Sequence, residues 1–276
     1  MSAVRSLRPV PPEAAQLAQR LRAHTQGEVM FDAPSRGRYA TDASIYQIMP
    51  IGVFVPSTTQ DVATALDIAR DLNAPVLARG GGTSQCGQTT GAALVIDTSK
   101  HLRKVLSFDK DAMTVTVEPG LVLDHLNAFL KPHGLWFPVD VSTSAQATLG
   151  GMAGNNSCGS RSIAYGNMVH NVLGASAWLS DGSEVNFGPV DSLGVKERAI
   201  AEFVRGLALA NASELESHWP KVMRRVAGSS SSSSAHCAWL RPSFHKMAGR
   251  KTSLRSFNKT APCICPATTS ALTCCQ

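Results

Sequence analysis

A run of three glycines directly after a short apolar stretch is the feature that most constrains this chain. Residues 75–78 read Pro-Val-Leu-Ala and are predicted to form a strand, and residues 79–88 follow as R-G-G-G-T-S-Q-C-G-Q. Because glycines lack Cβ atoms, they can take positive φ angles and let their N–H groups surround an anion. Thr83 and Ser84 add hydroxyl donors and Arg79 adds a positive charge, so we interpret the loop as a diphosphate site.

Two other kinds of glycine loop compete with this interpretation. The dinucleotide fingerprint requires G-x-G-x-x-G between a strand and a helix, but Gln85 stands where its third glycine belongs. The phosphate loop of nucleoside triphosphatases requires G-x-x-x-x-G-K-[ST], and residues 82–89 match it except that Gln88 replaces the lysine. A plain glycine-rich turn is a further alternative, and the loop by itself does not decide among them.

A second stretch rich in small residues favours a large polar ligand. Residues 148–159 read T-L-G-G-M-A-G-N-N-S-C-G, in which small side chains, amides and hydroxyls dominate. We predict a loop that is a poor core element but a close-fitting wall around a ligand. Two shorter motifs accompany it: V-E-P-G at 117–120, interpreted as a strand end running into a turn, and P-V-D-V-S at 138–142.

Taken together, these motifs resemble the FAD-binding domain of the vanillyl-alcohol oxidase/PCMH flavoprotein family. The resemblance rests on the order R-G-G-G-T-S-x-x-G-Q, V-E-P-G, P-x-D-x-S and T-L-G-G-M. It is most specific to the FAD-linked oxidases that act on D-2-hydroxy acids, such as the D-lactate and D-2-hydroxyglutarate dehydrogenases. Residues 41–50, T-D-A-S-I-Y-Q-I-M-P, also resemble that branch, and the likeness covers residues 33–228.

The resemblance implies a set of FAD-binding residues drawn from all four motifs. It implies that the first loop holds the pyrophosphate through backbone amides, that the V-E-P-G turn lies near the flavin or ribityl chain, and that the second stretch lines the other side. The implied residues are Arg79, Gly80, Gly81, Gly82, Thr83, Ser84, Gly87, Gln88, Pro119, Gly120, Asp140, Ser142, Thr148, Gly150, Gly151, Asn155 and Gly159.

The resemblance also bears on how the flavin is attached. In some relatives a histidine one place before the loop serine bonds covalently to the flavin ring. Here that place is Thr83, whose side chain cannot form the bond. We therefore predict non-covalent FAD.

A fold and a reaction follow from the same resemblance. It implies an α+β, PCMH-type fold of two subdomains with FAD between them: a small strand–helix subdomain and a larger mixed, mostly antiparallel sheet flanked by helices. It implies oxidation of a small 2-hydroxy acid, with hydride transfer to flavin N5 and a separate electron acceptor. The catalytic base normally comes from a following cap domain, so no catalytic residue is assigned. The alternatives are a nucleotide-binding module without redox activity and a non-catalytic interaction protein.

The C-terminal part of the chain differs in composition from the rest. From residue 229 onward there are six basic residues and no acidic one, and the segment begins with serines at 229–234. We divide the chain into an N-terminal helical extension (1–32), an FAD-binding domain (33–228) and an atypical tail (229–276) that is disordered or out of frame. We expect a reading-frame change near residue 228 to have removed the cap domain, leaving FAD binding with little or no turnover.

Charge and cysteine spacing argue against several partners. The formal net charge of +6 lies in the tail, so we expect no nucleic-acid partner. Cys263-x-Cys265 and Cys274-Cys275 do not match the usual C-x₂₋₄-C zinc spacing, so we predict no metal. No apolar run reaches the roughly 18 residues that span a bilayer, and the proline-rich start is not a secretory signal. We expect a cytoplasmic protein, with peripheral membrane contact left open.

Hydrophobic periodicity and turn residues predict the remaining elements. Thr59 is interpreted as the N-cap of a helix at 60–72, because its hydroxyl can accept a hydrogen bond from an amide of the first turn. The other predicted helices are 13–24, 121–130 and 197–210; the predicted strands are 52–55 and 93–97 and the hairpins 105–117 and 172–187.

Overall fold

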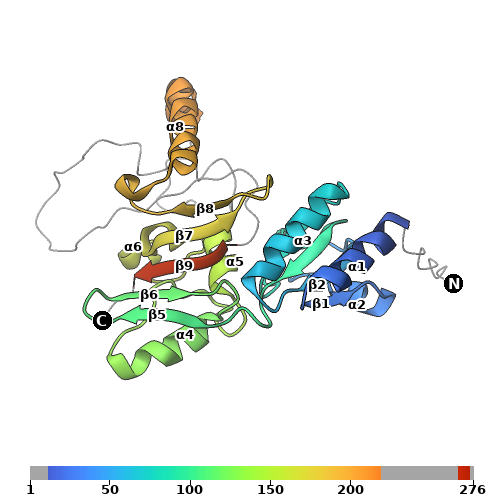
Figure 1. Ribbon diagram of the computed structural model, residues 1–276. Helices are drawn as coiled ribbons and strands as arrows, with labels where there is room; N and C mark the ends of the chain where they lie inside the picture. The colour runs from blue at the N-terminus through green and yellow to red at the C-terminus, as the bar shows by residue number, and fades with distance from the viewer. Residues whose placement is uncertain (1–11, 219–266, 274–276) are drawn as a thin grey trace, which may run out of the picture.

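The computed structural model describes residues 12–218 and 267–273. It shows two subdomains side by side, each built around one sheet (Figure 1). The first sheet has four strands and the second has five. This arrangement confirms the predicted α+β fold, in which a small strand–helix subdomain lies beside a larger, mostly antiparallel sheet.

The first subdomain has a mixed sheet with two helices on one face. Its strand order is β1 (Glu28–Met30), β2 (Gly52–Val55), β4 (Leu94–Asp97), β3 (Val76–Arg79). The β1–β2 pair is antiparallel, whereas β2–β4 and β3–β4 are parallel. Helices α1 (Pro12–His24) and α3 (Thr59–Asp71) bury their apolar sides against one face of this sheet, where Leu17, Leu21 and Phe54 form the core. Short helix α2 (Ala33–Arg38) follows β1.

Residues that the sequence assigned to an N-terminal extension belong to this subdomain. Helix α1 contributes Leu17 and Leu21, which are essentially inaccessible to solvent, to the same core as Phe54. Strand β1 pairs with β2 along its whole length. The boundary proposed at residue 32 therefore does not separate two structural units.

The second subdomain is built on a five-stranded sheet in which every neighbouring pair is antiparallel. The order is β5 (Val105–Asp109), β6 (Thr114–Val117), β9 (Ala267–Thr273), β7 (Val172–Trp178), β8 (Glu184–Phe187). Its main core contains Val117, Leu126, Phe137, Leu149 and Met152, contributed in part by helices α4 (Leu123–Leu130) and α5 (Leu149–Asn155).

The remaining helices lie around this sheet. The long helix α8 (Val195–Ala210) contacts β8 and projects away from the body of the molecule (Figure 1). The shorter ones are α6 (Ser162–Tyr165), α7 (Met168–Asn171), α9 (Ala212–His218) and the 3-10 turns η1 (Lys131–His133) and η2 (Val190–Ser192). Of the helices described, none combines the length and apolarity that crossing a bilayer requires.

Strand β9 lies in the segment that the sequence assigned to an atypical tail. Its backbone pairs with β6 from Thr114↔Thr273 to Val117↔Ser270, and with β7 on the other side. The segment A-T-T-S-A-L-T has no charge, proline or glycine, so nothing in it opposes an extended conformation. The tail was predicted to be disordered or out of frame, and this strand contradicts only the first of these alternatives, for these seven residues. Residues 229–266 lie outside the described part of the chain, so the frame-change hypothesis stays a prediction.

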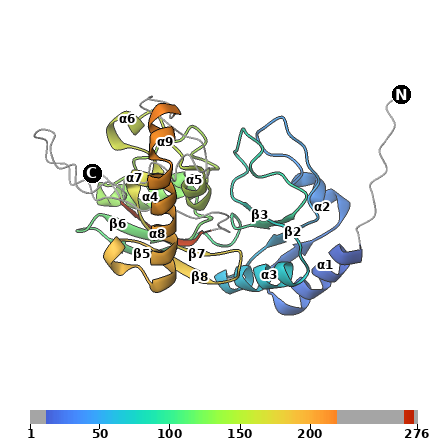
Figure 2. The ribbon, with the colours of Figure 1, turned by 90° about the horizontal axis from the view of Figure 1, so that it is seen from above.

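The two subdomains share buried surface. Trp178, at the end of β7, is 7% exposed and belongs to the core of the first subdomain. The turn between β7 and β8 lies against α3, since a Cβ built on Gly182 would come 2.2 Å from a guanidinium nitrogen of Arg70. These contacts join the two subdomains, which lie side by side in Figure 2.

The predicted helices and strands are present, with differences at their ends. The cap of α3 is Thr58 and not Thr59: the Thr58 hydroxyl accepts from the Asp61 amide at 3.1 Å, and the Asp61 carboxylate accepts from the Thr58 amide at 3.1 Å. This reciprocal pair satisfies two amides that would otherwise lack partners. Strand β1 and the helices α2 and α5 were not predicted from the sequence.

Replacing Asp61 should destabilise the first subdomain more than its place at a helix end suggests. Its carboxylate, 6% exposed, also accepts from the amides of Gln26 at 3.0 Å and Ser57 at 2.9 Å. We expect Asp61→Ala to lower the free energy of unfolding by about 2–3 kcal/mol, because a cap is lost and buried amides are left unpaired. Urea denaturation measures the change.

The matched control for this variant is Asp71→Ala. Asp71 ends the same helix, is exposed and pairs only with Arg20 among the described residues, so its loss should change stability by roughly 0.5 kcal/mol or less. Equal effects of the two substitutions would contradict the proposed role of Asp61.

Candidate functional site

The glycine loop leaves the carboxyl end of strand β3 and returns to the start of β4. Because β3 and β4 are parallel neighbours, the chain between them must cross back along the sheet. No helix lies between these two strands. The dinucleotide fingerprint and the triphosphatase phosphate loop both need a helix directly after the loop, so this loop has neither geometry.

The two stretches of small residues meet in space, as the sequence interpretation requires. A Cβ built on Gly80 would lie 2.1 Å from the Thr148 hydroxyl oxygen, and one on Gly81 would lie 2.1 Å from the Gln146 carbonyl oxygen. The Gln88 side-chain amide donates to the Asn155 side-chain oxygen at 3.3 Å. The two stretches therefore touch at Gly80 and Gly81, at distances that only glycine allows.

The Pro119-Gly120 turn packs against the start of the second small-residue stretch. The Gly150 amide donates to the Pro119 carbonyl at 2.8 Å, and a Cβ on Gly150 would come 2.6 Å from the Pro119 Cβ. On the other side, a Cβ on Gly120 would lie 2.0 Å from the Thr98 carbonyl oxygen. Glycines at three of the predicted motifs thus serve close contact between backbone segments.

The second small-residue stretch is not the loop that the sequence predicts. Its first part forms helix α5, and Thr148 is its N-cap, accepting a hydrogen bond from the Gly151 amide at 3.4 Å. Leu149 and Met152 are buried, at 0% and 2% exposure. The interpretation as a poor core element is wrong because these two apolar residues share the face turned to the core. Thr148 is itself only 1% exposed, so its hydroxyl serves the helix.

The glycine loop retains backbone donors without partners. Among the described residues, no hydrogen bond is made by the amide nitrogens of Gly81, Gly82 and Thr83. Gly82 has a φ of +65°, a left-handed conformation that occurs in the anion-binding turns in which successive N–H groups face one side. The Ser84 hydroxyl donates to the Gln88 side-chain oxygen at 2.7 Å, so the second half of the loop closes on itself. Three unpartnered amides on a glycine cradle fit a pyrophosphate.

The Arg79 side chain has hydrogen-bond partners that the sequence interpretation did not predict. Its guanidinium donates to the carbonyl oxygens of Tyr39, Thr41 and Thr89. The predicted fixed charge of the site is therefore engaged with backbone carbonyls next to the loop.

Asp140 and Gly159, two further predicted site residues, are in contact with each other. The Asp140 carboxylate accepts from the Ser160 hydroxyl at 2.6 Å and the Arg161 amide at 3.1 Å. A Cβ on Gly159 would lie 2.0 Å from the Asp140 carboxylate. Burial acts to raise the pKa of Asp140, but these hydrogen bonds and the Arg161 charge outweigh it and hold the pKa below its usual value. Asp140 holds the turn at 159–161, and Ser142 lies in an exposed turn.

The sequence interpretation assigned no site role to residues 41–46, although this segment is part of the resemblance. The Ala43 amide donates to the Gly82 carbonyl at 3.2 Å, and the Thr89 hydroxyl donates to Asp42 at 3.0 Å. Hydrogen bonds from Ser44 and Thr89 outweigh burial and lower the pKa of Asp42, so it stays an acceptor. The Tyr46 ring lies against Gly87. This segment is the outer rim of the glycine loop.

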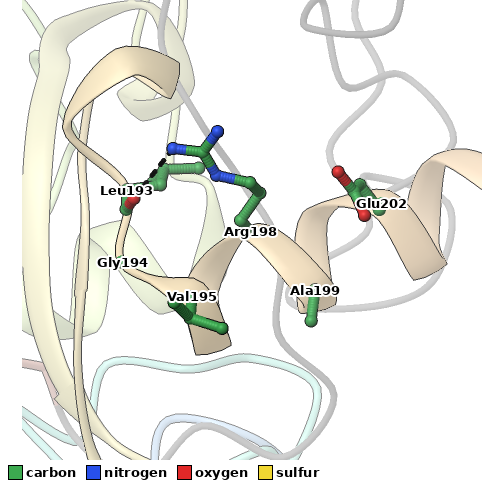
Figure 3. A pocket seen from close by; sticks show the side chains of 6 residues that line it. All are labelled: Leu193, Gly194, Val195, Arg198, Ala199 and Glu202. Atoms are coloured by element: carbon green, nitrogen blue, oxygen red, sulfur yellow. Dashed lines mark hydrogen bonds between the residues drawn. The ribbon is translucent and has the colours of Figure 1, made fainter.

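Other features of the described residues lie apart from this site. A cavity of about 400 Å³ lies at the start of α8 (Figure 3), and none of the predicted site residues lines it. Its lining residues are Leu193, Gly194, Val195, Arg198, Ala199 and Glu202. No group of three potential metal ligands occurs in the described part of the chain, and the cysteines at 263–275 lie outside the residues whose side chains are described.

Comparison with known proteins gives a family match. A family model described as "FAD binding domain" matches residues 50–188, which span both small-residue stretches. The chain is 38% identical over 167 residues to a D-2-hydroxyglutarate dehydrogenase of Pantoea ananatis, covering 59% of this chain and 16% of that protein. It is 34% identical over 159 residues to a mitochondrial D-lactate dehydrogenase [cytochrome] of Saccharomyces cerevisiae, covering 56% of this chain and 27% of that protein.

The fold comparison agrees with the sequence comparison. A solved alkyldihydroxyacetonephosphate synthase aligns with a TM-score of 0.58 at 19% identity, covering 67% of this chain and 37% of that one. This likeness concerns the fold alone. The chain spans only about a fifth or less of the length of the D-2-hydroxyglutarate dehydrogenases that it matches.

The contact between the glycine loop and residues 146–148 should be sensitive to the addition of a single methyl group. We expect Gly81→Ala to lower the free energy of unfolding by about 2–3 kcal/mol, because the added Cβ meets the Gln146 carbonyl and one backbone must move. Gly154→Ala, in helix α5 with nothing within 4 Å of the new Cβ, should instead raise it by roughly 0.5–1 kcal/mol. Urea denaturation of both variants measures the difference; a neutral Gly81→Ala would contradict the contact.

Proposed function

Because the chain belongs to the FAD binding domain family, we propose that it is the FAD-binding part of a flavin-dependent oxidoreductase acting on a 2-hydroxy acid such as D-2-hydroxyglutarate or D-lactate. The match over residues 50–188 supports FAD as the cofactor. The names of the relatives, D-2-hydroxyglutarate and D-lactate dehydrogenases, support the substrate class. The contact of Gly80 and Gly81 with residues 146–148 is the observation that carries the proposal, since it builds one cradle from both stretches.

The chain's own residues supply binding and orientation. The amides of Gly81, Gly82 and Thr83 would hold the pyrophosphate, and the second half of the loop, closed by the bond from the Ser84 hydroxyl to the Gln88 side-chain oxygen, would flank it. Gly151, exposed at the start of α5, and the half-buried Gly150 would line the rest of the dinucleotide, with the buried Pro119 and Gly120 packed behind them. The bound FAD supplies the hydride acceptor for oxidation of the carbon that carries the substrate hydroxyl. We assign no catalytic base within this chain.

The attachment of the cofactor follows from the residue before the loop serine. The histidine link of some relatives needs a nucleophilic ring nitrogen at that place, and the chain has Thr83. We therefore propose non-covalent FAD, held by hydrogen bonds and by the shape of the two walls. A separate electron acceptor and a cytoplasmic location, with peripheral membrane contact left open, complete the proposal.

The purified full chain should be yellow and should lose its colour on denaturation. We expect flavin absorption in the visible spectrum, and full release of FAD into the filtrate after heat or acid treatment, because no covalent bond retains it. Absorption spectroscopy of the filtrate and of the retained protein measures this. Colour that stays with the polypeptide would contradict the non-covalent part of the proposal and leave FAD binding intact.

Other outcomes of the same preparation select the alternatives. Magnesium-dependent ATP binding by a colourless protein would favour a nucleotide-binding module. A well-folded, colourless protein that binds neither nucleotide would favour an interaction protein. Rapid anaerobic bleaching by D-2-hydroxyglutarate, with no bleaching by its L enantiomer, would show that the substrate site also lies within this chain.

A further inference from the structure

The Arg79 side chain joins three backbone carbonyls next to the glycine loop. Its Nη1 donates to the Tyr39 carbonyl at 3.3 Å and to the Thr89 carbonyl at 3.2 Å, and its Nη2 donates to the Thr41 carbonyl at 2.9 Å. A guanidinium presents several donors in one rigid plane, which allows a single side chain to reach carbonyls from separate segments.

These carbonyls come from both sides of the loop. Tyr39 precedes the rim segment and Thr41 is its first residue, whereas Thr89 lies at the end of the glycine loop that Arg79 begins. The rim and the loop are also joined by the bond from the Ala43 amide to the Gly82 carbonyl at 3.2 Å. Arg79 is therefore the point where the start of the loop, its end and its rim are tied together.

The guanidinium also lies over an aromatic ring. It lies 5.1 Å from the centre of the Tyr39 ring, a distance at which a cation is attracted to an aromatic face. The Tyr39 hydroxyl donates at 2.7 Å to Asp97, which is 6% exposed and is the register partner of Arg79 in the sheet. Burial, with the adjacent Asp97 carboxylate, raises the pKa of Tyr39, so the hydroxyl remains a donor at all relevant pH values.

The guanidinium also abuts the turn of the loop. A Cβ built on Gly82 would lie 2.7 Å from the Arg79 Nη2. Gly82 has a φ of +65°, the left-handed conformation in which its neighbours' amides turn to one side. The side chain thus fills the space behind the residue that gives the cradle its shape.

From this geometry we propose that Arg79, held by Tyr39 and Asp97, is the positioning residue of the pyrophosphate cradle and not a ligand of the pyrophosphate. Its role is to fix the backbone of residues 80–89 so that the free amides point at one place. This inference rests on the proposed function for the identity of the ligand, but the positioning of the loop does not. The two can therefore be tested separately.

The first test measures amide exchange of the loop in the absence of cofactor. Amide hydrogen exchange of the full chain, followed over peptides covering 39–48 and 80–90, should be clearly faster in Arg79→Lys and in Arg79→Gln than in the wild type. Lysine keeps the charge but presents its donors from one point, so it should not hold three carbonyls. Arg20→Gln is the matched control, since Arg20 pairs on the surface with Asp71 and its loss removes the same charge. Unchanged exchange in both Arg79 variants would overturn the proposal.

The second test measures how the Arg79 substitutions change the affinity for FAD. FAD affinity is measured by quenching of flavin fluorescence at low and at high salt. We expect both Arg79 variants to bind FAD at least tenfold more weakly than the wild type, a loss that corresponds to one or two hydrogen bonds. The salt dependence of binding should match that of the wild type. Near-wild-type affinity in Arg79→Lys, with weak binding and a smaller salt dependence in Arg79→Gln, would overturn the proposal, because it identifies a direct charge contact with phosphate.

A milder variant covers the case in which the Arg79 variants do not fold. Tyr39→Phe keeps the ring under the guanidinium but removes the bond to Asp97. We expect faster exchange over residues 80–90 and FAD affinity reduced a few-fold. Wild-type behaviour of Tyr39→Phe in both measurements would overturn the claim that Tyr39 and Asp97 hold Arg79. A wild-type chain that binds no FAD would refute the proposed function, while the exchange experiment would still decide on the positioning of the loop.

Discussion

Contacts between backbone segments that leave no space for a side chain determine how this molecule is assembled. Gly81 lies on the Gln146 carbonyl and Gly120 lies on the Thr98 carbonyl, each at a distance that a Cβ would reduce to about 2 Å. Such contacts bring the end of a strand in one subdomain directly against the start of a helix in the other. Glycines cost chain entropy on folding, and here they allow backbone segments of the two subdomains to come into direct contact.

The interface between the two subdomains explains why a site forms at this place. Trp178 extends from the second sheet into the first core, and the β7–β8 turn abuts α3, so the subdomains are fixed at one end of their interface. The glycine loop, the Pro119-Gly120 turn and the start of α5 are then held as facing walls. Ligand sites at domain boundaries commonly arise in this way, because neither half has to bury the ligand alone.

Much of the fold could be predicted from the sequence, because long periodic segments and turn residues identify elements locally. Strand β2 and helix α3 are clear from their apolar spacing, and the α3 cap is displaced by one residue because Thr58 and Thr59 are both suitable. Helix α5 was missed because glycines and amides hide an apolar pair, Leu149 and Met152, that only the tertiary core makes visible. Strand β9 was missed because its pairing depends on two strands far away in the sequence.

The site was predictable in its location but less so in the roles of its side chains. Motif order indicated which backbone segments converge, since glycines mark close approach whatever the partner is. The charged residues were harder to interpret: Arg79, Asp140 and Asp42 all stand in or beside the motifs, yet each forms hydrogen bonds with neighbouring backbone. In a loop without its own secondary structure, backbone groups need side chains as hydrogen-bond partners. The charged residues nearest to the loop are the first side chains available for these bonds. The donors left for an anion are then neutral amides, whose position depends on the residues behind them. A sequence motif of this kind therefore describes the support of a binding site as much as the site itself.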